Sequence, residues 1–108
     1  MVVRVLIADD HAIVRAGIRL LLASQADFAV VGEATDGREA LELTGKLKPD
    51  VVLMDIAMPG LNGLEATREL KKRHPHLHVL ILTMYVDERY FFETIRSGAS
   101  GYVVKGAQ

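Results

Sequence analysis

The chain contains no cysteine and no tryptophan, and only three prolines among its 108 residues. Without cysteine it can form no disulfide, use no thiolate nucleophile and bind no metal through sulfur. The longest stretch free of Asp, Glu, Lys and Arg runs from His74 to Val86, which is shorter than the roughly 18 apolar residues of a membrane-spanning helix. The first apolar run ends in Asp9 and Asp10, unlike that of a signal peptide. We therefore expect a cytoplasmic protein without a membrane segment.

Neither sign of charge dominates, since 13 basic and 14 acidic residues give a formal net charge of −1. The chain also lacks the large basic cluster with which proteins bind nucleic acid. Half of its residues are apolar and a quarter are charged, which is typical of a globular domain. A chain of this length forms one domain with a core of its own. We therefore treat residues 1–108 as a single domain.

Five short apolar runs predict the strands of a sheet that is buried on both faces. The runs are Val3–Ala8, Ala29–Ala34, Val51–Met54, Val79–Leu82 and Gly101–Val104. Stretches with helical spacing lie between them, so strands and helices alternate along the chain. This alternation predicts an α/β domain with a doubly wound, five-stranded parallel sheet.

The expected helices have recognisable stripes and start signals. The first, from His11 to Ser24, carries one apolar stripe, which consists of Val14, Ile18, Leu21 and Leu22. We interpret Gly17 within it as a sign of close packing between helix and sheet. The next two begin with Asp or Asn followed three residues later by Glu; the pairs are Asp36 with Glu39 and Asn62 with Glu65. A fourth helix is expected to begin at Asp87 and end at Gly98.

Five predicted strands have only four helices between them, because the sequence ends at Gln108, just after the fifth strand. A complete domain of this kind would have one more helix, so we expect the chain to be truncated before its last helix. That truncation would leave an apolar face near the first and fifth strands. A second copy of the chain could cover this face.

Polar residues follow four of the five predicted strands. Asp9 and Asp10 follow the first, Asp55 the third, Thr83 the fourth and Lys105 the fifth. Because the carboxyl ends of parallel strands meet at one edge of a sheet, we expect these groups to lie together. A single Asp at a strand end is usually a loop cap, but polar groups at four strand ends favour a site. Two like charges about 4 Å apart repel by roughly 4 kcal/mol at an effective dielectric of 20, and Mg²⁺ would relieve that repulsion.

A carboxylate beside Mg²⁺ and a lysine is a plausible nucleophile toward phosphorus. We choose Asp55 for this role because it stands alone at the centre of the edge. Asp9 and Asp10 are adjacent and better placed to hold the metal. Thr83 could donate its hydroxyl to a phosphoryl oxygen, and Lys105 would neutralise negative charge.

At these residues the sequence resembles the receiver domain of two-component response regulators, and more narrowly the NarL/FixJ type with LuxR-type output. The matching segments are residues 6–11, 49–63, 81–84 and 98–105. They occur in the family's order and cover the whole chain. The resemblance implies a flavodoxin-like sheet with strand order 2-1-3-4-5.

The resemblance also implies roles for particular residues. Asp55 would accept a phosphoryl group from the phosphohistidine of a sensor histidine kinase and become an aspartyl phosphate. Asp10, Asp55 and the backbone carbonyl of Ala57 would ligate Mg²⁺ directly, while Asp9 would act through water. The chain would catalyse only its own phosphotransfer and a slow autodephosphorylation, as a switch rather than an enzyme.

Thr83 and Tyr102 would form the switch pair of this family. A phosphoryl group adds a charge of roughly −1.5 to −2, so Thr83 would move toward it and Tyr102 would turn inward. The changed surface would control a DNA-binding domain, and hence transcription. The sequence contains neither that effector domain nor the family's last helix. Gly106 follows Lys105 where many receivers have proline, a difference that NarL/FixJ-type receivers often share.

Three other functions compete with this interpretation. A receiver-like module could serve for docking without being phosphorylated. A haloacid dehalogenase-like phosphatase would need a second Asp two residues after the nucleophile, where this chain has Ala57. A flavodoxin-like cofactor binder would need a phosphate-binding loop after the first strand, where Asp9 and Asp10 would repel a phosphate.

The histidines have simpler interpretations than a separate metal site. His74, His76 and His78 are spaced like metal ligands, but they lie near the start of the fourth strand, far from the acids and without a nearby cysteine. We therefore expect no zinc site there. His11 follows the acid pair and fits equally well at the edge of the site and at the start of a helix.

Overall fold

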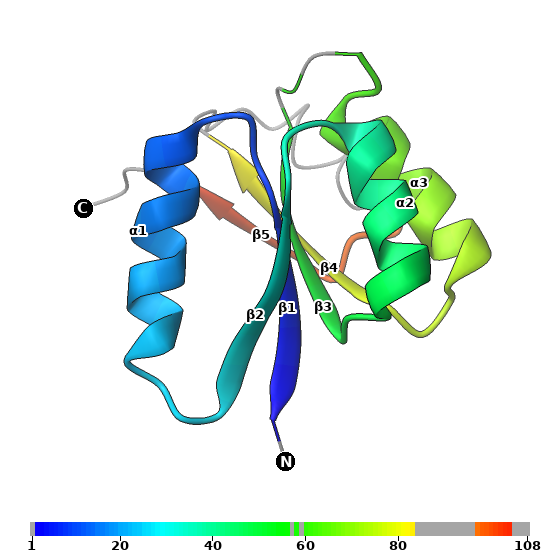
Figure 1. Cartoon of the computed structure of the whole chain (residues 1–108). Helices are drawn as coiled ribbons and strands as arrows, with labels where there is room; N and C mark the ends of the chain where they lie inside the picture. The colour runs from blue at the N-terminus through cyan, green and yellow to red at the C-terminus, as the bar shows by residue number, and fades with distance from the viewer. Residues whose placement is uncertain (1, 57, 59, 84–96, 105–108) are drawn as a thin grey trace.

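The computed structural model describes residues 2–56, 58, 60–83 and 97–104, with only the backbone at 83 and 102–104. Its elements are β1 (Val3–Ala8), α1 (Ala12–Ala23), β2 (Phe28–Ala34), α2 (Gly37–Leu47), β3 (Val51–Asp55), α3 (Gly63–Arg73), β4 (His78–Thr83) and β5 (Gly101–Val104). The strands form one parallel sheet in the order β2-β1-β3-β4-β5 (Figure 1). This flavodoxin-like order confirms the predicted fold class.

The central strands are apolar because both faces of the sheet are covered. Leu6 and Ile7 of β1, Val52 and Met54 of β3, and Ile81 of β4 are fully buried. The bounds of β2, β3 and β4 differ from the predicted runs by one residue at one or both ends, since pairing with a neighbour extends these strands beyond their apolar runs. At the end of β3, for example, Asp55 is paired with Leu82.

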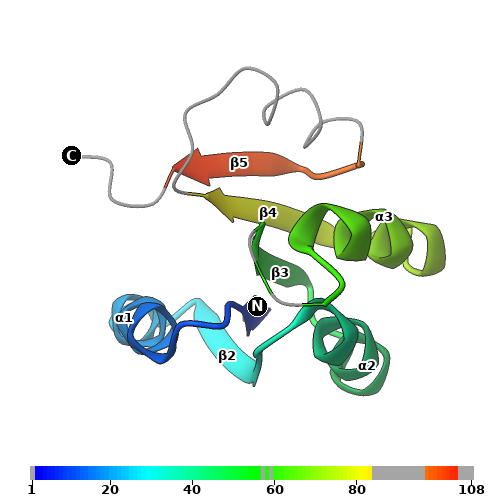
Figure 2. The ribbon, with the colours of Figure 1, turned by 90° about the horizontal axis from the view of Figure 1, so that it is seen from above.

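The three helices that the structure describes cover the two faces of the sheet unequally. Figure 2 shows α1 on one face and α2 and α3 together on the other, an arrangement that Figure 1 also shows. Ala40 and Thr44 of α2 are buried, as are Ala66 and Leu70 of α3. No residue of α1 is buried. The main apolar core therefore lies between the sheet and the α2–α3 pair.

The packing of α1 differs from the prediction at two positions. Val14, Ile18 and Leu22 are half-buried as expected, but Leu21 is 71% exposed. Leu21 lies about 100° around the helix from Leu22, which turns it away from the sheet. Gly17 does not mark close packing either, because a Cβ added there would meet nothing within 4 Å.

The predicted start signals of α2 and α3 are confirmed. The side chain of Asp36 accepts a hydrogen bond from the Glu39 N–H at 2.8 Å, and that of Asn62 accepts one from the Glu65 N–H at 3.0 Å. These bonds satisfy N–H groups that have no partner within the helix. The fourth helix expected between residues 87 and 98 falls almost entirely outside the described residues. No helix in the described ranges has the length and apolar character needed to cross a bilayer.

Candidate functional site

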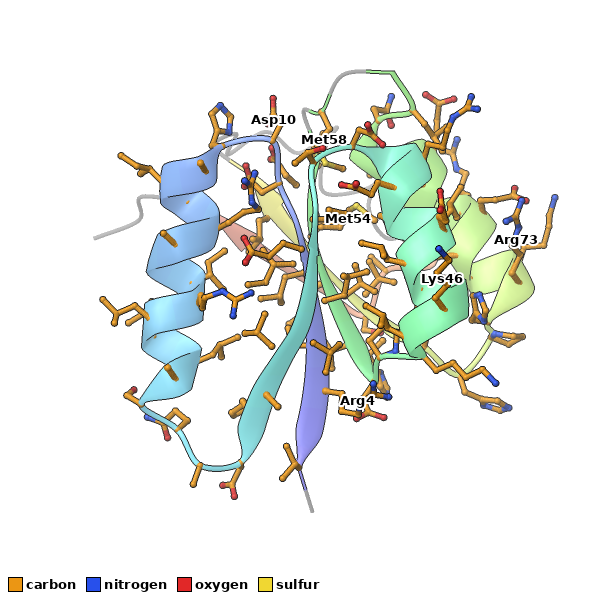
Figure 3. All side chains as sticks on the ribbon, viewed as in Figure 1. Arg4, Asp10, Lys46, Met54, Met58 and Arg73 are labelled. Atoms are coloured by element: carbon orange, nitrogen blue, oxygen red, sulfur yellow. The ribbon has the colours of Figure 1, made fainter. Side chains whose placement is uncertain are left out.

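Three carboxylates meet at the carboxyl ends of two central strands. Asp9 and Asp10 follow β1, and Asp55 is the last residue of β3. One ligand atom from each of these residues and from His11 lies within 4.8 Å of all the others. Figure 3 shows Asp10 at one end of the sheet and Arg4 near the other. The structure therefore brings together the acidic residues that the sequence placed at this edge.

These carboxylates are withdrawn from water to different extents. Asp9 is 0% exposed and Asp55 is 3% exposed, whereas the Asp10 side chain is 31% exposed. Burying a carboxylate is costly unless hydrogen bonds or opposite charge compensate for the lost hydration. Asp9 accepts a hydrogen bond from the backbone N–H of His11 at 2.8 Å. A cation bound between the carboxylates would supply further compensation.

His11 occupies both of the positions that the sequence left open. It is the N-cap residue of α1, and its Nδ1 atom lies 3.0 Å from Asp9 Oδ1 and 3.2 Å from Asp10 Oδ1. Its ring is 61% exposed. His11 therefore forms the solvent-facing side of the acidic cluster.

The donor set fits a hard divalent cation. Carboxylate oxygens at this spacing are the ligands that Mg²⁺ prefers, usually together with retained water molecules. Carboxylates gathered without a cation would repel one another or bind protons. The cluster thus fits the Mg²⁺ ion that the sequence predicted.

The segment after Asp55 is held close to the end of β3. The Ile56 N–H donates to the Leu82 carbonyl at 3.2 Å, and the Gly63 N–H donates to the Ile56 carbonyl at 2.9 Å. Ile56 and Met58 are each 6% exposed and belong to the core. These contacts anchor the segment that leads from the cluster to α3.

The other predicted site residues are described only in part. Thr83 is the last residue of β4. Tyr102 lies in β5, where it pairs with Ile81 of β4. Their backbones therefore have the strand positions that the sequence predicted. Ala57 and Lys105 lie outside the described residues, so their predicted roles stay predictions.

A polar network that was not predicted from the sequence lies behind the cluster. Arg15 Nη1 donates to the backbone carbonyl of Asp9 at 2.8 Å, and Arg15 Nε donates to Glu33 Oε1 at 3.0 Å. Arg19 Nε donates to Glu33 Oε2 at 2.8 Å. The hydrogen bond from Arg19, followed by that from Arg15, lowers the pKa of Glu33 although partial burial opposes the shift.

Two sequence signals could have revealed this network. Glu33 is the one charged residue in the otherwise apolar run Phe28–Ala34. Arg15 and Arg19 are four residues apart, so they share a helix face. A lone acid in an apolar strand and two arginines on one face of the preceding helix can form ion pairs with each other.

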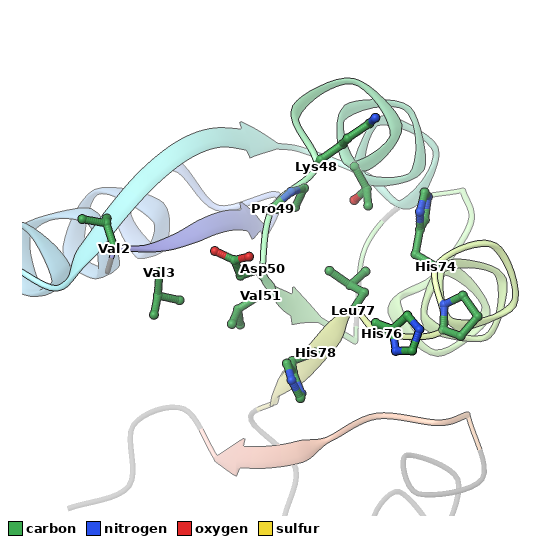
Figure 4. A pocket seen from close by; sticks show the side chains of 12 residues that line it. Val2, Val3, Lys48, Pro49, Asp50, Val51, His74, His76, Leu77 and His78 are labelled. Atoms are coloured by element: carbon green, nitrogen blue, oxygen red, sulfur yellow. The ribbon is translucent and has the colours of Figure 1, made fainter.

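The three histidines near β4 are not among the potential metal ligands that converge in the described residues. His74, His76 and His78 line a groove of about 800 Å³ at the amino-terminal end of the sheet (Figure 4). Across the part of the chain that the structure describes, the only group of three or more potential metal ligands that converge is the cluster with Asp9, Asp10, His11 and Asp55. The groove therefore lies apart from the acidic cluster.

Comparison with known proteins identifies the family. Residues 5–108 match the model of the response regulator receiver domain. The chain is 46% identical over 103 residues to the transcriptional regulatory protein DegU of Brevibacillus brevis, covering 95% of this chain and 44% of DegU. It is 48% identical over 105 residues to the oxygen regulatory protein NreC of Staphylococcus haemolyticus, covering 96% of this chain and 48% of NreC. The chain thus spans about half the length of these relatives.

Solved structures agree with this assignment. A LuxR-family two-component response regulator from Aurantimonas sp. SI85-9A1 superposes with a TM-score of 0.95 at 39% identity, over 100% of this chain and 77% of that one. The receiver domain of a response regulator NarL from Mycobacterium tuberculosis gives a TM-score of 0.94 at 33% identity, over 99% of this chain and 86% of that one. The chain therefore belongs to the response regulator receiver domain family, among relatives of the NarL and LuxR type.

Proposed function

We propose that the chain is a phosphoacceptor whose Asp55 receives a phosphoryl group from a sensor histidine kinase. Receiver domains are signalling switches, and those of LuxR-type regulators interact with histidine kinases. The observation that carries the proposal is the convergence of Asp9, Asp10, His11 and Asp55 within 4.8 Å. A buried carboxylate at the centre of an acidic edge, next to a cation site, suits nucleophilic attack on phosphorus.

In the proposed transfer, a carboxylate oxygen of Asp55 attacks the phosphorus of the kinase phosphohistidine. An O–P bond forms as the P–N bond breaks, and the electron pair of that bond returns to the imidazole nitrogen. The product is an aspartyl phosphate on this chain and a free histidine on the kinase. The low exposure of Asp55 limits competing solvation of the nucleophile.

By the family resemblance, Asp10, Asp55 and the backbone carbonyl of Ala57 would hold Mg²⁺, with Asp9 acting through water. When bound, Mg²⁺ would neutralise negative charge on the transferring phosphoryl group. Lys105 would contribute a second positive charge. These assignments extend the observed carboxylate cluster to two residues outside the described ranges.

Phosphorylation would then be transmitted through Thr83 and Tyr102. Thr83 ends β4, the strand next to β3 in the sheet, so it lies on the strand neighbouring Asp55. Its hydroxyl would bind a phosphoryl oxygen, and Tyr102 on β5 would turn inward behind it. The resulting change would control transcription through a DNA-binding effector domain. We propose a cytoplasmic location for this phosphorelay.

Two alternatives stay distinguishable from this proposal. A receiver that serves only for docking would keep the fold without accepting phosphate. A phosphatase would release phosphate continuously, although Ala57 stands where such an enzyme has its second Asp. The intact acidic cluster favours phosphorylation over docking alone.

Incubation with Mg²⁺ and acetyl phosphate would test the proposal. Mass spectrometry should detect a base-labile gain of one phosphoryl group in the parent chain and none in Asp55→Asn. Asp27→Asn, which removes an acid outside the cluster, is the matched control and should still be phosphorylated. No gain in the folded parent would contradict the proposal, and continuous phosphate release would favour the phosphatase.

A further inference from the structure

We propose that Arg15 is a positioning residue for the metal site, and that Glu33 holds Arg15 in place. Arg15 fixes the peptide between Asp9 and Asp10 in the orientation that binds Mg²⁺. This inference rests on the proposed function, because it concerns the same acidic cluster.

Asp9 is held by three different parts of the chain. Its N–H donates to the carbonyl of Ala34 at the end of β2 at 3.0 Å. Its carbonyl accepts a hydrogen bond from Arg15 Nη1 at 2.8 Å. Its carboxylate accepts one from the His11 N–H at 2.8 Å. Of the two contacts to backbone atoms of Asp9, the one from Arg15 comes from a side chain, and the His11 ring Nδ1 lies 3.0 Å from the Asp9 carboxylate.

The bond to Arg15 sets the direction of two carboxylates together. The Asp9 carbonyl belongs to the planar peptide unit that joins Asp9 to Asp10. The side chains of both residues leave from the two Cα atoms of that plane. Rotation of the peptide would therefore move the Asp9 and Asp10 carboxylates relative to Asp55, and the hydrogen bond from Arg15 opposes such rotation.

Arg15 is itself held firmly. Its side chain is 17% exposed, and its Nε is bonded to Glu33 Oε1 at 3.0 Å. Because the guanidinium is planar and rigid, fixing Nε on Glu33 also fixes the direction of Nη1 toward Asp9. Arg19 Nε and Nη2 bind the other carboxylate oxygen of Glu33. The ligands are thus held by a chain of contacts from Asp9 to Arg15 to Glu33.

This network also anchors a helix whose side chains are at most half-buried. No residue of α1 is buried, and its apolar contacts with the sheet involve only half-buried side chains. The hydrogen bonds of Arg15 and Arg19 join this helix to β2 and to the end of β1. The position of α1 and the geometry of the acidic cluster are therefore linked through one guanidinium.

Charge and positioning predict opposite results when Arg15 is replaced by methionine. Removing a positive charge near an acidic cluster would strengthen Mg²⁺ binding if charge alone mattered. Removing the hydrogen bond to Asp9 would weaken it if positioning matters. Weaker binding by Arg15→Met is therefore a specific sign of positioning.

The test is a calorimetric Mg²⁺ titration of the folded 108-residue chain. The dissociation constant of Arg15→Met should rise about tenfold, within the range seen when groups supporting metal ligands are removed. Arg73→Met is the matched control, because Arg73 pairs with Glu69 at 3.2 Å on α3, well away from Asp10 (Figure 3). Its dissociation constant should stay close to that of the parent.

Two further measurements separate positioning from general destabilisation. Arg15→Lys keeps the positive charge, but a lysine ammonium cannot bind the Asp9 carbonyl and Glu33 Oε1 with the fixed geometry of a guanidinium. This variant should therefore also bind Mg²⁺ more weakly. This variant carries the test if Arg15→Met does not fold. In the metal-free state, the amide resonances of Asp10 and His11 should shift in Arg15→Met and stay unchanged in Arg73→Met.

Mg²⁺ binding by folded Arg15→Met that equals or exceeds that of the parent would overturn the inference. If Arg15→Met does not fold, parental Mg²⁺ affinity in Arg15→Lys would overturn it. Failure of the proposed function looks different, because the parent chain itself would then bind no Mg²⁺ or accept no phosphoryl group. A parent that binds Mg²⁺ and is phosphorylated, with an Arg15→Met variant of equal affinity, would refute the positioning role alone.

Discussion

Gly63 packs directly against the backbone of Asp55. A Cβ added to Gly63 would lie 2.0 Å from the Asp55 carbonyl oxygen and 2.8 Å from the Cα of Ile56. Both neighbours are backbone atoms, which cannot move aside as a flexible side chain can. The start of α3 and the proposed phosphoacceptor therefore depend on the same glycine.

Gly63→Ala should disturb the site as well as the fold. We expect a loss of about 1–3 kcal/mol in the free energy of unfolding, which is typical of overpacking, together with slower phosphorylation of Asp55 because its backbone must shift. Denaturant unfolding and the acetyl phosphate assay would measure the two effects. Gly45→Ala is the control, since a Cβ at Gly45 would meet nothing within 4 Å; this change inside α2 should raise stability by about 1 kcal/mol and leave phosphorylation unchanged. Parental behaviour of Gly63→Ala in both assays would contradict this expectation.

Gly17→Ala should have the opposite effect on stability. Gly17 lies inside α1, and a Cβ there has open space. Alanine is favoured over glycine in a helix by about 1 kcal/mol, so the variant should unfold at a higher denaturant concentration with an unchanged slope. Unchanged or lower stability would indicate that this position has a packing partner after all.

The Glu33 network should make stability depend on pH. The hydrogen bond from Arg19 is the largest cause that lowers the pKa of Glu33 below its ordinary value of 4.5. A lowered pKa means that Glu33 contributes its full stability above pH 4.5, and that this contribution is lost as the pH falls toward the folded-state pKa. The difference in Tm between the parent and Glu33→Gln should therefore shrink as the pH drops below about 4.5.

Glu69→Gln provides the control for that pH series. Glu69 pairs with Arg73 on an exposed surface of α3, where ion pairs contribute little. The difference in Tm between Glu69→Gln and the parent should be small at every pH of the series. A Glu33→Gln difference that stays constant from neutral to acidic pH would show that the ionised form of Glu33 adds no stability.

The outward face of α1 should promote self-association. Ile13 is 85% exposed, Leu20 is 74% exposed and Leu21 is 71% exposed. The apolar face that the sequence predicts near β1 and β5 involves β5 side chains outside the described residues. Large exposed apolar patches commonly mediate contact between chains. Sedimentation should show concentration-dependent association that Leu20→Lys reduces. A compact monomer at all concentrations would contradict this.

Local patterns in the sequence were enough to predict the strands and helices that the structure describes. Asp36 and Asn62 cap their helices as expected because capping depends on residues three positions apart. The apolar runs became parallel strands because buried strands need apolar side chains on both faces. The convergence of Asp9, Asp10 and Asp55 was also predictable, since parallel strands of similar length end at the same edge.

Only the tertiary structure decided which face of α1 meets the sheet and what supports the acidic cluster. Leu21 and Leu22 are both apolar, so the sequence could not show that only Leu22 turns inward. Arg15 and Glu33 are 18 positions apart, and they meet because β2 pairs with β1 while α1 crosses above them. Capping and strand formation depend on near neighbours, whereas these contacts depend on how complete elements pack together in space.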